Sequence, residues 1–283
     1  PKGFGILDSS DTQGLMKELL KDFTLAEKAD FDTGKLSFIL SDLRSKNKKE
    51  AEGEDVYSVA ASWLLPRYLK RIYQLGVVDF DELLLRPLKV FRDHPEVKAR
   101  VQNAFTQVMV DEFQDTNRTQ MNLVTEISET HNNITVVGDD DQSIYGWRGA
   151  CIDNILGFPH LFTSCEVVRL ESNYRSSQRI LNIANKIIEK NEKRHQKILR
   201  ASASSVEGNL PEVFVYETED EEVERTIDDI ESQIQKGQSP DRFAILFRSN
   251  TQGAVFEAEL KKRGIPHRVS GTTSFFERKE IKD

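Results

Sequence analysis

The sequence has little cysteine, no long apolar run and no excess of positive charge. Its two cysteines, Cys151 and Cys165, and its five histidines form no metal-ligand spacing, and a reducing compartment is the default expectation. No apolar stretch approaches the roughly 20 residues of a membrane-spanning helix. The first ten residues, PKGFGILDSS, lack the basic and apolar regions of a secretory signal. We therefore expect a cytoplasmic protein with no membrane partner.

The charge balance is acidic. The 283 residues include 47 Asp and Glu against 39 Lys and Arg, a net charge of −8. Phosphate contacts need Lys and Arg, so this balance argues mildly against a nucleic-acid binder, although a local basic groove remains compatible with it. The length predicts more than one domain or one large one.

The first hundred residues have the periodicity of amphipathic helices. Helices are expected at 9–23, 57–76, 79–91 and 95–105, and Pro66 is expected to kink or split the second of them. The charged segment 42–55 has no apolar period and is expected to be an exposed loop.

After Phe105 apolar strands alternate with helical segments, a pattern that predicts a parallel α/β sheet. Strands are expected at 106–113 and 133–142, with a helix at 117–131 between them. A second α/β unit is expected from about Glu166, with strands at 166–170, 212–216, 242–247 and 266–270 and helices at 176–193, 220–237 and 254–264. The last residues, FFERKEIKD, have the pattern of a helix that is just beginning, and we expect the chain to be a piece of a longer protein.

The segment VMVDEFQDTN is an apolar strand that ends in acids. Asp111, Glu112 and Asp115 follow the strand, at the position where open α/β sheets bind ligands. Asp-Glu after a hydrophobic strand is the Walker B arrangement, in which the first acid holds Mg²⁺ and the second polarises the attacking water. Solvated acids at an ordinary strand end would give the same short pattern.

A second cluster lies in VVGDDDQSIYGWRGA. We expect that a core segment would not tolerate three adjacent Asp, and a plain surface loop rarely carries Tyr145 and Trp147 together. The amide of Gln142 can sense a γ-phosphate, and the two rings offer faces on which bases could stack. The alternative is that Trp147 is a packing residue.

A third cluster precedes a predicted helix in LESNYRSSQRIL. Tyr174 could lie against a purine ring, and Arg175 could reach a γ-phosphate as an arginine finger. An ordinary helix N-terminus capped by Ser176 or Ser177, with an exposed Tyr-Arg pair, is the alternative.

Together, in this order, the three segments resemble the UvrD/Rep-type superfamily-1 DNA helicases. VDEFQDTN is similar to motif II of that family, VVGDDDQSIYGWRGA to motif III and LESNYRSS to motif IV. GVVDFDELLLRP and the C-terminal stretch from Leu246 to Asp283 also resemble the family, and SGTTSFF is closer to its Rep branch. The resemblance implies parts of two RecA-like motor domains: a helical insert at 1–103, the back half of the first motor domain at 104–171 and the front half of the second at 172–283.

The resemblance also implies roles at an ATP·Mg²⁺ site. Asp111 would hold Mg²⁺, Glu112 would activate water and Asp115 would belong to the nucleotide site. Tyr174 would stack on adenine and Arg175 would serve as the arginine finger.

Further residues are implied in coupling and in DNA contact. Gln142 would contact the γ-phosphate and couple it to single-stranded DNA. Tyr145 and Trp147 would stack on bases with Arg148 beside them, while Arg248 and Asn250 would contact the DNA backbone. The implied activity is 3′–5′ translocation and unwinding at duplex–single-strand junctions, in the cytoplasm and at the nucleoid.

One element of such a site is missing from these residues. A phosphate-binding loop reads G-x-x-x-x-G-K-[ST], but at Gly34-Lys35 the next residue is Leu36 and position 29 is Ala. We therefore expect this polypeptide alone to be inactive, and to self-associate or to associate with the rest of the motor. Two alternatives stay open: a non-catalytic pseudo-helicase that binds single-stranded DNA or a partner, and part of a helicase-nuclease of the AddA or RecB type.

Overall fold

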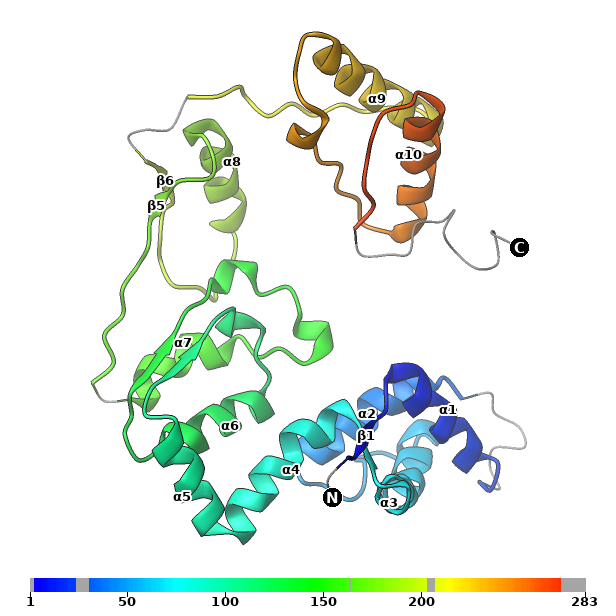
Figure 1. Cartoon of the computed structure of the whole chain (residues 1–283), viewed down its shortest axis with the longest axis vertical. Coiled ribbons are helices and arrows are strands. Elements are labelled where there is room, and N and C mark those ends of the chain that lie inside the picture. The colour runs from blue at the N-terminus through cyan, green and yellow to red at the C-terminus, as the bar shows by residue number, and fades with distance from the viewer. Residues whose placement is uncertain (1–2, 24–30, 163, 203–206, 271–283) are drawn as a thin grey trace. The chain divides into compact units, whose positions relative to one another are not determined.

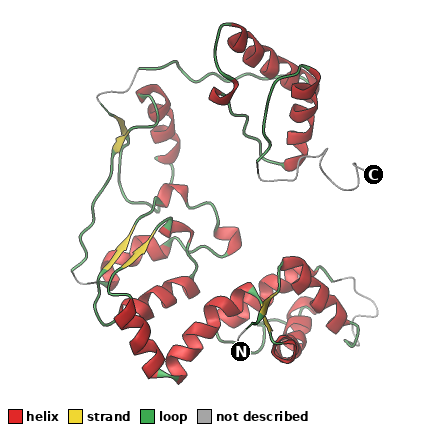
Figure 2. Ribbon diagram, in the orientation of Figure 1, coloured by secondary structure: helices red, strands yellow, loops and turns green. Residues whose placement is uncertain are grey.

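The computed structural model describes residues 3–23, 31–162, 164–202 and 207–270. The chain divides into two compact units, residues 1–207 and 208–283. Most of each unit is helix or loop, and the strands are short pairs (Figures 1 and 2). All three strand pairs in the described part of the chain are parallel, which confirms the α/β class: β1 with β2, β3 with β4, and β5 with β6.

In the N-terminal part, the described residues form four helices and one strand pair. The strands β1 (Gly5–Ile6) and β2 (Val77–Val78) accompany α1 (Ser9–Leu20), α2 (Thr33–Ser45), α3 (Val56–Leu75) and α4 (Phe80–Asp93). An aspartate caps the N-terminus of each helix by accepting backbone N–H hydrogen bonds. These caps are Asp8, Asp32, Asp55 and Asp79.

The apolar faces of α1, α2 and α3 form the largest core. Met16, Leu36 and Leu64 are almost fully buried in it. Helix α3 continues across Pro66, so of the two expected effects, a kink or a split, the split does not occur. Burial of the surrounding apolar face offsets the backbone hydrogen bond that a proline cannot donate. The expected loop 42–55 was also partly wrong, because α2 extends to Ser45 and was not predicted.

A buried ion cluster joins α2 to the start of α4. The guanidinium of Arg44 donates to both carboxylate oxygens of Asp79, at 2.6 and 3.0 Å, and to Glu82 at 2.9 Å. The hydroxyl of Tyr68 also donates to Asp79, at 2.8 Å. Burial alone would raise the pKa of Asp79, but the hydrogen bonds and charge of Arg44 hold it below its ordinary value. The segment GVVDFDELLLRP therefore contains the acidic residues that connect α4 to α2.

The central part contains the expected strands at 106–113 and 133–142, but each is short. Strand β3 (Val108–Val110) pairs in parallel with β4 (Ile134–Val136).

Around these strands lie three helices: α5 (Pro95–Ala104), α6 (Arg118–Ser128) and α7 (Asp153–Leu161). Helix α7 was not predicted. Phe113 packs edge-on against Phe158 of α7, with ring centres 5.4 Å apart. This contact anchors the turn that follows β3 over a small apolar core.

The next segments complete the first unit. Strands β5 (Ser172–Asn173) and β6 (Arg200–Ala201) flank α8 (Gln178–Ile188). The second unit contains α9 (Glu219–Gln235) and α10 (Asn250–Lys262), which pack through a core that includes Ile227 and Phe256.

Four strand predictions were wrong. Among the described residues, 166–170, 212–216, 242–247 and 266–270 form no strand. Val213, Val215 and Leu246 in these segments are at least 90% exposed. Apolar sequence predicts an extended backbone, but a strand also requires a hydrogen-bonded neighbour, which the sequence of one segment does not contain. The SGTTSFF segment beyond Ser270 and the expected helix beginning at 275 lie outside the described residues.

Candidate functional site

The candidate site lies where β3 and β4 end. Val110 is opposite Val136 in the parallel pair, so the residues after both strands meet at one edge of the sheet. The pairing continues beyond the strands: Val137 N–H donates to Val110 O at 2.8 Å, and Phe113 N–H donates to Val137 O at 2.9 Å. The acids after each strand are thereby brought together.

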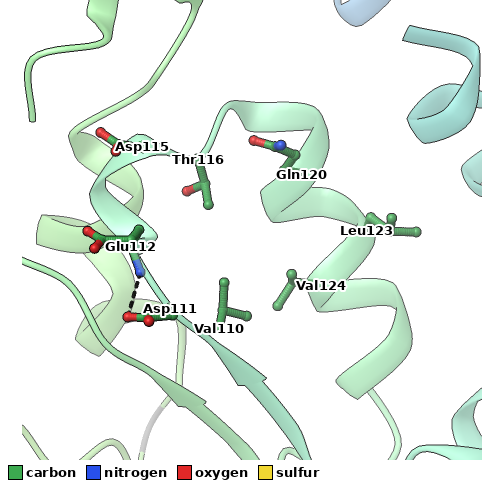
Figure 3. A pocket seen from close by; sticks show the side chains of 8 residues that line it. All are labelled: Val110, Asp111, Glu112, Asp115, Thr116, Gln120, Leu123 and Val124. Carbon is green, nitrogen blue, oxygen red and sulfur yellow. Dashed lines mark hydrogen bonds between the residues drawn. The ribbon is translucent and has the colours of Figure 1, made fainter. Parts of the chain in front are cut away.

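A pocket of about 370 Å³ opens beside this edge. Figure 3 shows Asp111, Glu112 and Asp115 along one side of it and side chains of α6 along the other. Its lining consists of Val110, Asp111, Glu112, Asp115, Thr116, Gln120, Leu123 and Val124. The wall is therefore acidic on the strand side and partly apolar on the helix side.

The backbone of Glu112 is in an unusual conformation. Its φ of 50° and ψ of 41° are in the left-handed region, which costs a non-glycine residue roughly 1–2 kcal/mol. The N–H of Glu112 donates to Asp111 Oδ1 at 2.9 Å, as the dashed line in Figure 3 shows. The next residue, Phe113, is held by the hydrogen bond from its N–H to Val137 O. Strain held in this way is typical of functional turns.

Asp115 supplies a second unusual feature. Its Oδ1 atom is buried and has no hydrogen-bond partner among the described residues. A buried carboxylate oxygen without a donor is costly, and it is a common feature of binding sites whose ligand supplies the missing contact.

The carboxylates suit a magnesium ion held mainly by a nucleotide. Mg²⁺ in such sites takes one or two carboxylates together with phosphate oxygens and water. Asp111 and Glu112 are exposed at the pocket, and they provide this donor type. Within the described residues, no group of three or more His, Cys, Asp or Glu side chains is arranged to hold a metal without such a ligand.

Gln114 is a site residue that the sequence analysis missed. Its side chain is 1% exposed and bridges the two strand ends. Its Nε2 donates to Glu112 Oε2 at 2.7 Å, and its Oε1 accepts the Asp139 N–H at 3.0 Å. The signal in the sequence was a glutamine inside an acidic turn directly after an apolar strand.

The three adjacent aspartates are not a fully solvated run, although only the middle one is buried. Asp140 is only 6% exposed. Lys197 Nζ lies 2.8, 2.7 and 3.1 Å from Asp139, Asp140 and Asp141, respectively. Arg194 donates two hydrogen bonds of 2.7 Å to Asp141. Burial is tolerated because cations from a distant part of the chain neutralise the carboxylates.

The pKa shifts in this cluster follow from its geometry. Burial alone would raise the pKa of Asp140, but hydrogen bonds from Lys197 and the N–H of His195 bring it below its ordinary value. Asp139 behaves in the same way, with burial opposed by Lys197 and Gln142. Burial alone would lower the pKa of Lys197, but its hydrogen bonds to the carboxylates raise it overall.

The predicted γ-phosphate sensor is joined to the pocket through this loop. Gln142 Nε2 donates to Asp139 Oδ2 at 2.7 Å, and the side chain is exposed. Asp139 in turn donates its N–H to Gln114, which contacts Glu112.

The predicted DNA-stacking residues form an exposed cluster in the same loop. The ring centres of Tyr145 and Trp147 are 6.4 Å apart, and the guanidinium carbon of Arg148 lies 5.6 Å from each. Trp147 is 72% exposed, so the packing alternative does not describe it. Exposed aromatic rings with a cation beside them suit base stacking.

The other predicted residues do not line the pocket. Tyr174 is 82% exposed, and Arg175 is exposed, with its N–H donating to Asn173 Oδ1 at 2.9 Å. Ser177, one of the two serines expected to cap this helix, is the N-cap residue of α8, but its hydroxyl makes no capping hydrogen bond. Arg248 is exposed in the second unit, where Asn250 begins α10.

Comparison with known proteins defines the class. Residues 1–163 match the family model described as the UvrD/REP helicase N-terminal domain, and residues 168–283 match the UvrD-like helicase C-terminal domain. The chain therefore belongs to the UvrD/Rep helicase family, as the motifs predicted.

Among individual proteins, the chain is similar to ATP-dependent DNA helicase PcrA of Staphylococcus epidermidis strain RP62A, with 35% identity over 286 residues. PcrA of Staphylococcus aureus strain Mu50 is 35% identical over 288 residues. In both cases the match covers 100% of this chain and 39% of the relative's length. Within the described residues, no helix is long and apolar enough to cross a membrane.

Proposed function

We propose that this chain carries the middle part of an ATP-dependent 3′–5′ DNA helicase that couples ATP hydrolysis to unwinding of duplex DNA. The observation that carries the proposal is the pocket at the ends of β3 and β4. There, Glu112 is joined through Gln114 and Asp139 to Gln142. Family membership and the PcrA relatives support the same activity.

In this proposal residues 1–103 form the helical insert. Residues 104–171 form the back half of the first RecA-like motor domain, and residues 172–283 form the front half of the second. Two parallel strands that end in acids, with helices beside them, support the first motor domain. The insert is supported by its own helical core.

The proposed roles follow the chemistry of each group. Asp111 holds Mg²⁺ with the phosphates, and the carboxylate of Glu112 orients and deprotonates the attacking water. Asp115, with its buried unpartnered oxygen, takes a hydrogen bond in the occupied nucleotide site. Tyr174 stacks on adenine and Arg175 neutralises charge on the γ-phosphate, both from an exposed loop that can receive a ligand.

The DNA site in this proposal is the exposed cluster of Tyr145, Trp147 and Arg148. The bases of a single strand stack on the two rings, and Arg148 offsets phosphate charge. Arg248 and the residue at 250 contact the DNA backbone. Duplex–single-strand junctions are the substrate, and the protein acts in the cytoplasm at the nucleoid.

An ATPase assay tests the proposal. The full-length product of the gene should hydrolyse ATP with stimulation by single-stranded DNA, and Glu112→Gln should lower kcat by about 10²–10⁴-fold, the usual contribution of general base catalysis. The 283-residue chain alone should show no turnover, because no Walker A loop surrounds the phosphates. Absence of turnover in the full-length protein would overturn the proposal, and Glu112-dependent turnover in the 283-residue chain would overturn its stated inactivity.

Single-stranded DNA binding without turnover is the second candidate, and the exposed Tyr145–Trp147 pair favours testing it. The sequence has two tryptophans, Trp63 and Trp147, so a Trp63→Phe background isolates the loop signal. Oligo(dT) should quench Trp147, and the affinity should fall steeply with salt. Quenching in the 283-residue chain together with an inactive full-length protein would favour this candidate.

A further inference from the structure

We propose that Gln114 is a positioning residue for ATP hydrolysis, which sets the carboxylate of Glu112 according to the position of the loop that carries Gln142. The inference rests on the function proposed above. It adds a residue and a coupling route to that function, since Gln114 is not itself among the residues that line the pocket.

Both polar atoms of the Gln114 side-chain amide make hydrogen bonds. Nε2 donates to the Glu112 carboxylate at 2.7 Å, and Oε1 accepts the backbone N–H of Asp139 at 3.0 Å. The orientation of the amide follows from its partners, because a carboxylate requires a donor and an N–H requires an acceptor. The side chain is 1% exposed, so water cannot readily replace either contact.

The loop after β4 packs closely against Gln114. A Cβ added at Gly138 would lie 2.6 Å from Gln114 Oε1, so the glycine permits the close approach. The hydroxyl of Ser143 donates to the Gln114 backbone oxygen at 3.3 Å. The residues after β4 therefore hold Gln114 at the backbone and at the side chain.

Glu112 depends on this contact. Its carboxylate is exposed at the pocket, and among the described residues Gln114 is the one side chain that donates a hydrogen bond to it. The same Asp139 that holds Gln114 through its N–H accepts from Gln142 through Oδ2 at 2.7 Å. Movement of Gln142 toward a phosphate breaks its hydrogen bond to Asp139, the residue whose N–H holds the Gln114 amide that orients Glu112.

The substitution Gln114→Met keeps similar volume and removes both hydrogen bonds. In the full-length protein, kcat for DNA-stimulated ATP hydrolysis should fall about 10- to 100-fold, as expected for loss of a hydrogen bond to a charged group. The KM for ATP and the Kd for oligo(dT) should each change less than about threefold, since Gln114 lines neither site. Gln114→Glu keeps the acceptor for Asp139 but loses the donor and repels Glu112, so its kcat should fall at least as far.

A double-mutant measurement separates positioning from a structural role. In a Glu112→Gln background, single-turnover hydrolysis should show no further decrease when Gln114→Met is added, because the effect acts through the Glu112 carboxylate. Gln102→Met is the matched control: Gln102 is 5% exposed and donates to Glu126 O at 2.7 Å, and neither residue lines the pocket. Its kcat should stay at the wild-type value.

Each outcome decides the inference. An inactive wild-type full-length protein overturns the proposed function and this inference with it. An active wild type whose Met and Glu variants keep kcat within threefold overturns the inference alone. An equal decrease from Gln114→Met in both backgrounds also overturns it, because the residue then acts on folding. If the Met variant does not fold, the isosteric Gln114→Glu variant gives the answer.

Discussion

Replacing Lys197 by Met should release the loop after β4 from the segment that follows α8. Lys197 Nζ lies within 3.1 Å of carboxylate oxygens from Asp139, Asp140 and Asp141. Its side chain is 14% exposed, and that of Asp140 is 4% exposed. Removal of the cation leaves three neighbouring carboxylates with Arg194 as the main neutralising group.

The structure sets the size of the effect. Breaking a buried ion pair by removing one partner typically costs 3–5 kcal/mol. Here Asp141 keeps two hydrogen bonds from Arg194, and Asp140 keeps the N–H of His195 at 2.8 Å. Water also screens the partly exposed ammonium. We therefore expect a loss of about 2–3 kcal/mol, which increases local opening roughly 30- to 150-fold.

Hydrogen exchange measured by mass spectrometry on the 283-residue chain provides the local readout. Peptides covering 138–149 should lose protection in Lys197→Met, while those from the core of α1 to α3 should keep it. Lys193→Met is the matched control, because Lys193 is exposed in the same segment and the charge change is equal. Protection of 138–149 equal in Lys197→Met and Lys193→Met would refute the reasoning.

Three further predictions concern the same architecture. Gly138→Ala should lower the free energy of unfolding by about 1–3 kcal/mol through overpacking, measured by thermal unfolding. Arg44→Met should cost about 3–5 kcal/mol, measured in urea, because Asp79 is left buried without the charge and the two hydrogen bonds of Arg44. The pKa values of Asp139 and Asp140 are lowered in the folded state, so their contribution to stability is complete above the unfolded pKa of about 3.9 and is lost as pH falls through the lower folded pKa. Trp147 fluorescence should report this acid transition.

Each of these three predictions has a control that uses another variant of the same chain. Gly146→Ala introduces a Cβ that meets nothing within 4 Å and should leave stability unchanged, so equal effects at 138 and 146 would contradict the packing argument. Arg86→Met removes a 39% exposed partner of Glu82 and should cost less than about 1 kcal/mol. An acid transition that is unchanged in Lys197→Met would contradict the assignment of the pH effect.

The sequence predicted those features of the site that depend on residues close together in the chain. An apolar strand followed by Asp111 and Glu112 predicted a carboxylate pair at a sheet edge, and the parallel pairing of β3 with β4 confirmed that edge. For Trp147 the sequence left base stacking and packing as alternatives, and the structure decided between them because the side chain is 72% exposed. The positions of the helices followed from the spacing of apolar residues and from capping residues, except for α2 and α7, which were not predicted.

The sequence by itself determined the family, the α/β class and the order of the motifs, because these depend on residues that are neighbours in the chain. Only the tertiary structure decided that Asp140 is buried, since its partner Lys197 lies 57 residues away. It also decided that the amide of Gln114 joins Glu112 to Asp139, across 25 residues. The expected strands of the second unit failed for the same reason. Hydrophobic pattern describes one segment, whereas ion pairs, amide bridges and sheet hydrogen bonds each require a partner brought close by folding.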